Sequence, residues 1–181
     1  MNNQFYLAIA ATLLIVIIGG YFVYRGYGNK YGGNRKSTVV DMTSLENEIN
    51  IVLSQKPINP LNPSLVFVRA PKIVDALRTD LDSVRLRTQE SGDQQVYNQL
   101  IEMSKKYVGI LNELLGTTNA YEMLGGYESG GPKDNYRIKK DDLYNQLITT
   151  GDSIALIVGE QSQLRTAQES LVSSFASQKL N

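Results

Sequence analysis

The pattern of apolar and polar positions divides the chain into two parts. Positions 5–24, FYLAIAATLLIVIIGGYFVY, carry no charge, and their most polar residues are Thr12 and the tyrosines. A helix rises about 1.5 Å per residue, so this segment would span roughly 30 Å, the thickness of a bilayer core. From residue 43 onwards, apolar residues instead recur at the three- and four-residue spacings of amphipathic helices. The pattern predicts a mainly α protein, with a single N-terminal transmembrane helix at 5–24 and a small helical hairpin or bundle after it.

Four helices are predicted in the domain 42–181, at about 43–55, 72–90, 93–115 and 139–177. The first begins with a capping box, in which Thr43 accepts from the amide of Glu46 and the Glu46 carboxylate reaches back. The first three helices each carry one apolar stripe, formed by Leu45, Ile49, Val52 and Leu53, by Ile73, Leu77, Leu81 and Val84, and by Val96, Leu100, Met103, Tyr107, Ile110 and Leu114.

The last predicted helix is the longest, and its 3–4 spacing of apolar residues continues for roughly thirty-five residues. Gly151 and Gly159 each cost about 1 kcal/mol relative to alanine inside a helix, and each marks either close packing or a break. Gln161 and Gln168 fall on the apolar seam and weaken it. We expect this helix to pack against the second and third, with its C-terminal turns projecting beyond them. Helix–helix self-association stays open.

A proline-rich stretch separates the first two predicted helices. Pro57, Pro60 and Pro63 recur every third residue, as in polyproline II, and form either a rigid connector or a docking strip. The stretch lacks the basic signature that flanks PxxP docking motifs, which favours the connector. An extended segment is predicted next, which is either covered by helices or free to bind a partner. The candidate partner-binding residues are Leu65, Val66, Phe67 and Val68. Pro71 is expected in the first turn of the following helix.

Charge is distributed unevenly and predicts the topology. Residues 1–36 carry four basic residues and no acid, whereas the rest of the chain has a net charge of −4. By the positive-inside rule, the tail 1–4 is translocated and the C-terminal domain stays on the cytoplasmic side of the membrane. Residues 25–41 are expected to form a Gly-, Tyr- and Lys/Arg-containing tether. The residues expected at the membrane interface are Tyr21, Tyr24, Arg25, Tyr27, Lys30, Tyr31, Arg35 and Lys36.

Composition argues against catalysis. The chain has no His and no Cys, which removes the commonest general base, the thiol nucleophile and most zinc ligands. Asp80 and Asp82 are two residues apart, and Asp141 and Asp142 are adjacent, so neither pair would share a face of a helix. We therefore expect no enzyme activity, no catalytic or metal site and no cofactor. The acidic domain repels phosphate backbones, so nucleic acid is not an expected partner either.

The whole layout resembles that of single-pass minor capsid proteins from large icosahedral double-stranded DNA viruses with an internal membrane. The resemblance rests on the membrane segment, the basic tether, the proline strip and the helices that follow, and on no shared motif. It implies a structural virion component that links the internal membrane to other capsid proteins from the capsid-facing side. The alternative is an adaptor or assembly factor anchored in a bacterial inner membrane, with a cytoplasmic helical domain.

Overall fold

A computed structural model describes residues 42–125 and 131–179 of the chain, and side-chain surroundings up to residue 172. The described residues form five helices and no strand: α2 (Met42–Ser54), α3 (Leu65–Ser91), α4 (Gln94–Met123), α5 (Pro132–Val158) and α6 (Gln163–Lys179). All five belong to one compact unit, Val39–Asn181. The predicted mainly helical class is thus confirmed for this unit.

The predicted transmembrane helix 5–24, the tail 1–4 and the tether 25–41 lie outside the described residues. Within the described ranges, each helix is either too short or too polar to cross a membrane.

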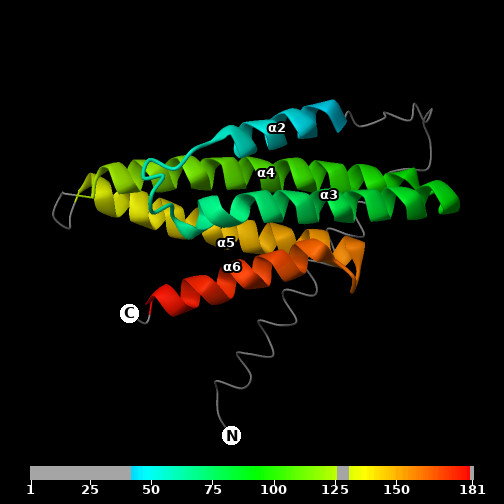
Figure 1. Ribbon diagram of the computed structural model, residues 1–181. Helices are drawn as coiled ribbons and strands as arrows, with labels where there is room; N and C mark the ends of the chain where they lie inside the picture. Colours follow the sequence, from blue (N-terminus) through cyan, green and yellow to red (C-terminus); the bar gives the residue numbers. More distant parts are fainter. Residues whose placement is uncertain (1–41, 126–130, 180–181) are drawn as a thin grey trace, which may run out of the picture. The chain divides into compact units, whose positions relative to one another are not determined.

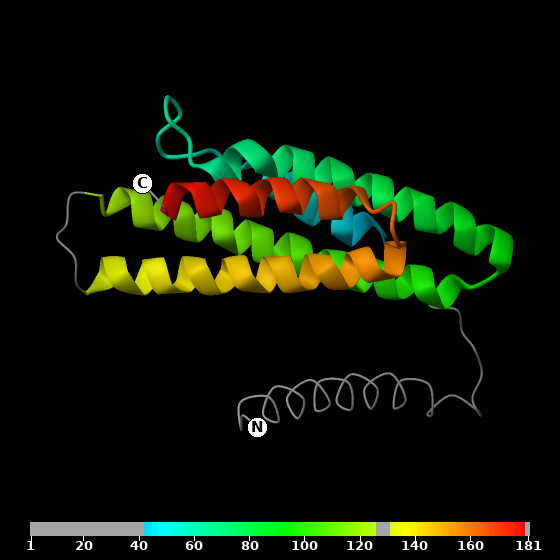
Figure 2. The same cartoon turned by 90° about the horizontal axis from the view of Figure 1, so that it is seen from below.

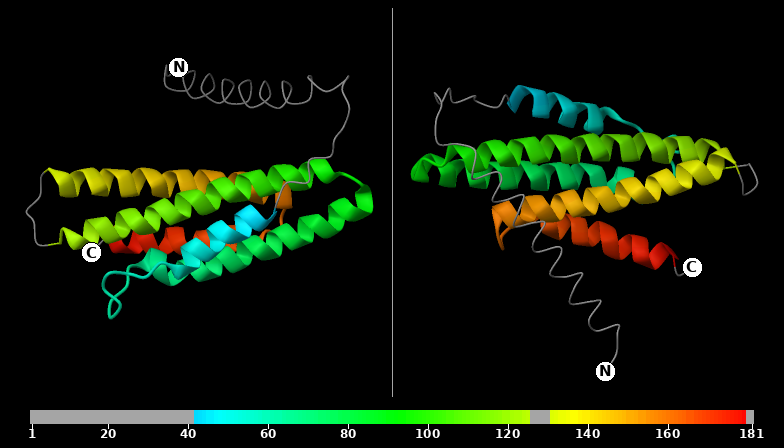
Figure 3. Two further views of the ribbon diagram at one scale, coloured as in Figure 1. Left: turned by 90° about the horizontal axis from the view of Figure 1, so that it is seen from above. Right: turned by 180° about the vertical axis from the view of Figure 1, so that it is seen from behind.

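The helices run alternately up and down (Figure 1). α4 packs most extensively against α5 and also against α3, while α6 lies on α3 and α5. These four helices form an elongated bundle, seen from a second side in Figure 2. The short α2 lies across α3 and α4 on the outside of the bundle (Figure 3). Four long helices and one cover helix therefore share a single core.

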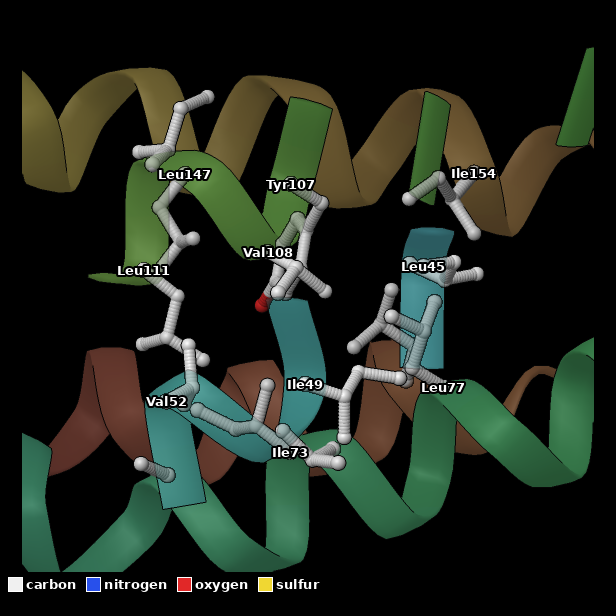
Figure 4. Close-up of a cluster of buried hydrophobic side chains, with 14 of the residues drawn as sticks. Leu45, Ile49, Val52, Ile73, Leu77, Tyr107, Val108, Leu111, Leu147 and Ile154 are labelled. Atoms are coloured by element: carbon white, nitrogen blue, oxygen red, sulfur yellow. The ribbon is translucent and has the colours of Figure 1, made fainter. Parts of the chain in front are cut away.

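The apolar stripes of the sequence form that core (Figure 4). Each stripe residue of α3, from Ile73 to Val84, is at most 2% exposed. Leu45 and Ile49 of α2 meet them from above, and burial of each such side chain stabilises the fold by about 1.5–3 kcal/mol. Leu53 departs from the prediction, because it lies on the outer side of the last turn of α2 and is 40% exposed.

The start of the first helix differs from the prediction. α2 begins at Met42, which puts Thr43 inside the helix rather than at its N-cap. The Glu46 carboxylate instead accepts a hydrogen bond from Nη2 of Arg78, at 2.7 Å. The side chain therefore joins α2 to α3, an interaction between elements that no local sequence pattern encodes.

The prediction of an extended segment at residues 65–68 is wrong. α3 begins at Leu65, and the amides of Phe67 and Val68 both donate to the Ser64 carbonyl. Pro71 lies inside the helix rather than in its first turn, at the cost of one backbone hydrogen bond. Burial of Val66 and Ala70 offsets this cost, since the two residues extend the buried stripe on the N-terminal side of Ile73.

The single helix predicted at 139–177 is also wrong. α5 starts earlier, with Pro132 at its first position, and ends at Val158, after which the chain reverses into α6. Gly159 ends α5 with φ +103°, a value that side-chain-bearing residues rarely adopt. Of the two outcomes foreseen for the glycines, Gly159 is therefore a break, and Gly151 is a close contact. The third predicted helix starts as expected after Gly92 but continues to Met123.

Candidate interaction surface

The predicted partner-binding segment does not form one exposed strip. Val66 is only 2% exposed and belongs to the core, while Leu65 and Phe67 are half-buried against it. Val68 alone faces solvent, at 53% exposure. This segment therefore belongs mainly to the core. Because it is helical, neighbouring residues face different sides of the helix, and Val66 and Val68 differ in exposure for this reason. The predicted membrane-interface residues, from Tyr21 to Lys36, lie outside the described residues.

The connector between α2 and α3, residues 55–64, presents apolar side chains that the sequence analysis did not single out. Leu61 at its tip is 96% exposed, and Ile58 is 46% exposed. Beside this tip, the Asn62 amide donates to Oδ1 of Asn59 at 3.3 Å, a side-chain-to-backbone bond that closes the turn. The connector thus contains a hydrogen-bonded turn with an exposed leucine at its tip.

A side-chain amide of α4 fixes this connector to the bundle. Nδ2 of Asn119 donates to the Lys56 carbonyl, and Oδ1 of Asn119 accepts from the Ile58 amide, both at 3.0 Å. One amide thereby satisfies the backbone on both sides of Pro57, as a neighbouring strand would. Gln55 adds a second attachment, since its Nε2 donates to the backbone carbonyl and side-chain oxygen of Asn112. These contacts favour the predicted rigid connector.

The neighbouring ends of α4 and α5 expose further apolar and basic groups. Met123 is 69% exposed and Ile138 is 61% exposed. On the ring of Tyr121, Nζ of Lys140 lies 4.7 Å from the centroid and Nζ of Lys133 lies 5.6 Å away. Cation–π contacts of this kind hold the lysine stems against the aromatic ring.

An ion pair across the α4–α5 interface completes this region. Nζ of Lys139 lies 2.7 Å from Oε1 of Glu113. The hydrogen bond that Lys139 donates to the Glu113 carboxylate raises the pKa of Lys139 above its ordinary value. The connector, the end of α4 and the start of α5 lie at the same end of the bundle (Figures 1 and 2). We call this region the connector end.

One interior polar group, the carboxylate of Asp80, joins α3 to the start of α6. Asp80 is 1% exposed, and its carboxylate accepts from Oγ of Ser162 at 2.7 Å and from the amides of Gln163 and Leu164 at 2.8 and 3.0 Å. Asp82 points away and forms a surface ion pair with Arg85. The two aspartates therefore do not converge, as predicted. Asp80 was missed as a cap because its partners follow it by more than eighty residues.

The chemistry available on the described surface is modest. No group of three or more Asp, Glu, His or Cys residues that would hold a metal ion occurs among the described residues. A small open cleft of about 130 Å³ lies between α5 and α6, lined by Ile148, Asp152, Arg165, Gln168, Glu169 and Val172.

Comparison with known proteins gives no assignment. The chain matches no protein-family model, no curated protein and no solved structure.

Proposed function

We propose that the protein is a non-enzymatic tether, anchored in a membrane by residues 5–24, that links this membrane to a protein assembly through its helical bundle. The role closest to this proposal is that of a minor capsid component between an internal membrane and a protein shell. The uncharged segment followed by Arg25, Lys30 and Arg35 supports the membrane part of the proposal. The same charge pattern supports a bundle on the cytoplasmic, capsid-facing side.

The connector end is the proposed contact with the protein assembly. Its exposed apolar side chains, Ile58, Leu61, Met123 and Ile138, come from three different elements of one end of the bundle. α2 begins at Met42, directly after the predicted tether, and runs about 20 Å along the bundle before it reaches this end. A contact made there would thus be separated from the point where the tether joins the bundle.

The exposure of Leu61 is the single observation that supports this site best. A leucine at 96% exposure leaves nearly all its apolar surface in water, and the connector that presents it is fixed by Asn119. Presenting an apolar group on a preorganised turn reduces the entropy lost on binding. Partner proteins bury such groups as anchors in their own pockets.

Crosslinking in native membranes tests the proposal. The full-length chain is treated with an amine-reactive crosslinker, and the products are identified by mass spectrometry. We expect adducts from Lys56 and Lys133, at the connector end, to an abundant structural protein. Crosslinks to a low-copy enzyme or secretion complex would contradict the shell role and favour a membrane-anchored adaptor. Recovery of the chain in the soluble fraction after alkaline extraction would contradict the anchor.

A pair of leucine variants makes the test specific to the surface. Leu61→Asp alters the connector end, whereas Leu156→Asp alters a leucine that is 77% exposed near the end of α5, at the opposite end of the bundle. Both should keep the helical circular dichroism of the parent protein. We expect Leu61→Asp to lower the yield of partner adducts at least tenfold, and Leu156→Asp to leave it unchanged. Equal yields from both variants would exclude the connector end as the contact.

A further inference from the structure

The chain between α5 and α6 has the properties of a hinge. Only four residues, Gly159 to Ser162, separate the end of α5 from the start of α6. Gly159 has φ +103°, and a Cβ added there would meet no atom within 4 Å. An alanine at this position would therefore act through the backbone conformation alone. It would disfavour the reversal and favour continuation of the helix.

The described side chains of α6, up to residue 172, form an apolar seam against the bundle. Leu164 and Leu171 are fully buried, and Gln168 between them is 3% exposed. They fill the groove between α3 and α5, the two helices that α6 contacts. Nε2 of Gln168 donates to the Ile148 carbonyl at 2.8 Å, which fixes the register of α6 on α5. The groove is therefore shaped for this particular helix.

The apolar spacing continues through the hinge. Leu143, Thr150, Ile157, Leu164 and Leu171 recur every seven residues. A helix that continued from α5 into α6 would keep these positions on one side, so the same sequence fits a straight helix as well as the hairpin. In the straight form, α6 would leave its own groove. The groove that fits it then belongs to another copy of the chain.

Two residues of α3 hold the hinge in its closed form. Asp80 accepts three hydrogen bonds from Ser162, Gln163 and Leu164. On the other side, Nη2 of Arg87 donates to the Val158 carbonyl at 2.8 Å. In a continuous helix the amides of residues 163 and 164 would bond within the helix, so Asp80 would lose these donors. The hairpin of the monomer is thus stabilised at the hinge by these contacts from α3. The remaining contacts between α6 and the α3–α5 groove would be the same in the hairpin and in the straight form.

We propose that the α3–α5 groove is an interaction surface for a second copy of this chain, which inserts its α6 in a reciprocal, domain-swapped dimer. Exchange of identical elements keeps every contact of the groove and changes only the hinge. The dimer has two-fold symmetry, with a straight α5–α6 helix from each copy crossing between the two bundles. This inference concerns the bundle alone and does not depend on the proposed tethering role.

A crosslinking experiment between two tagged copies tests the swap. Asp152 and Glu169 are both exposed and line the same small cleft between α5 and α6. One full-length copy carries Asp152→Cys and the other carries Glu169→Cys, and the native chain contributes no cysteine. The copies are co-purified in a mild detergent and treated with a short bis-maleimide. An adduct between the two tags forms at these positions only when the α6 of one copy lies on the α5 of the other.

Gly159→Ala should raise the yield of this adduct at least tenfold and shift the chain to a dimer in light scattering. Gly116→Ala is the matched control, because this glycine of α4 also has no atom within 4 Å of an added Cβ. It should leave both readouts unchanged. A Gly159→Ala protein that stays monomeric would overturn the proposal, as would a dimer without the adduct.

A second measurement covers the case in which Gly159→Ala does not fold. The two cysteine-bearing copies, with the native hinge, are mixed in urea and refolded together at low and at high protein concentration. Swapping predicts that the yield of the adduct between the tags increases with protein concentration. Introducing Asp80→Asn into both copies should increase this yield further. An adduct yield that does not change with concentration or with Asp80→Asn overturns the proposal.

Discussion

Asp80 on α3 accepts a 2.7 Å hydrogen bond from Oγ of Ser162, at the residue just before α6 begins. Oγ of Ser162 in turn accepts from the Arg165 amide at 3.2 Å, so the first turn of α6 is capped both from within and from another helix. A free helix N-terminus leaves amides without partners, and a carboxylate there also interacts favourably with the helix dipole. The start of α6 is therefore determined by a residue of α3.

The first prediction concerns this cap. Asp80→Asn should lower the free energy of unfolding by about 1–3 kcal/mol, because the amide nitrogen cannot accept the bonds that the carboxylate oxygen accepted. Urea titration of the full-length chain in detergent measures the loss, and hydrogen exchange should show faster exchange at Gln163 and Leu164. Asp82→Asn is the control. Its exposed ion pair with Arg85 should contribute less than about 1 kcal/mol. Equal losses in the two variants would contradict the capping role.

The second prediction contrasts two glycines. A Cβ at Gly151 would overlap Oε1 of Gln168 and would lie 2.8 Å from its Cδ and 3.0 Å from Cε2 of Tyr107. Both neighbours are buried, so Gly151→Ala should lower the free energy of unfolding by about 1–3 kcal/mol despite the helix propensity of alanine. Gly116→Ala has open space and should raise it by up to about 1 kcal/mol.

Thermal unfolding compares the two glycine variants directly. Adding Gln168→Ala to Gly151→Ala should recover part of the lost stability, since it removes one of the two overlapping neighbours. If the two glycine variants changed stability in the same direction, the close contact between α5 and α6 at Gly151 would be refuted.

The third prediction concerns the phenol of Tyr107. The side chain is fully buried in the core (Figure 4), and its hydroxyl has no hydrogen-bond partner among the described residues. Leaving a buried donor unpaired costs about 1–3 kcal/mol. Tyr107→Phe should therefore leave stability at pH 8 unchanged or raise it by about 1 kcal/mol. A clear loss of stability at this pH would contradict the absence of a partner.

The same residue predicts an alkaline effect. Burial, followed by the nearby Tyr144 and Asp152, raises the pKa of Tyr107 well above its ordinary value of 10.0. Above about pH 10 the Tyr107 phenol ionises in the unfolded state but stays neutral in the folded state. The contribution of Tyr107 to stability is therefore complete below about pH 10 and falls as the pH rises further. At pH 11 the native chain should lose about 1.4 kcal/mol relative to Tyr107→Phe. Urea titrations at pH 8 and 11 measure this difference, and Tyr97 and Tyr144 contribute equally to both proteins.

The fourth prediction concerns the connector. Asn119→Ala removes the two hydrogen bonds on either side of Pro57 and should lower the free energy of unfolding by about 1 kcal/mol. It should also increase proteolysis near Leu61, since the turn is no longer fixed to α4. Asn145→Ala, at an exposed position of α5, is the control and should change neither property. Unchanged proteolysis in Asn119→Ala would show that the connector is held by other contacts.

Helical periodicity is a local property, and the sequence therefore predicted it well. The stripe from Ile73 to Val84 and the turn at Gly92 both agree with the structure, because side-chain spacing and the freedom of glycine act within a few residues. The candidate site was less predictable. Four apolar residues, Leu65–Val68, are equally compatible with a core and with an interface, and only the packed helices place Val66 inside and Val68 outside.

The sequence by itself determined that this chain forms amphipathic helices, and it supplies the apolar and charge patterns on which the membrane proposal rests. Tertiary structure decided where two of the helices begin and end. α3 starts at Leu65, ahead of Pro71, because burial of Val66 and Ala70 outweighs one lost backbone bond. The chain reverses at Gly159 although its apolar spacing continues, because Asp80 stabilises the new helix start and the α3–α5 groove buries α6. Both outcomes depend on residues distant in sequence, whose burial no local pattern encodes.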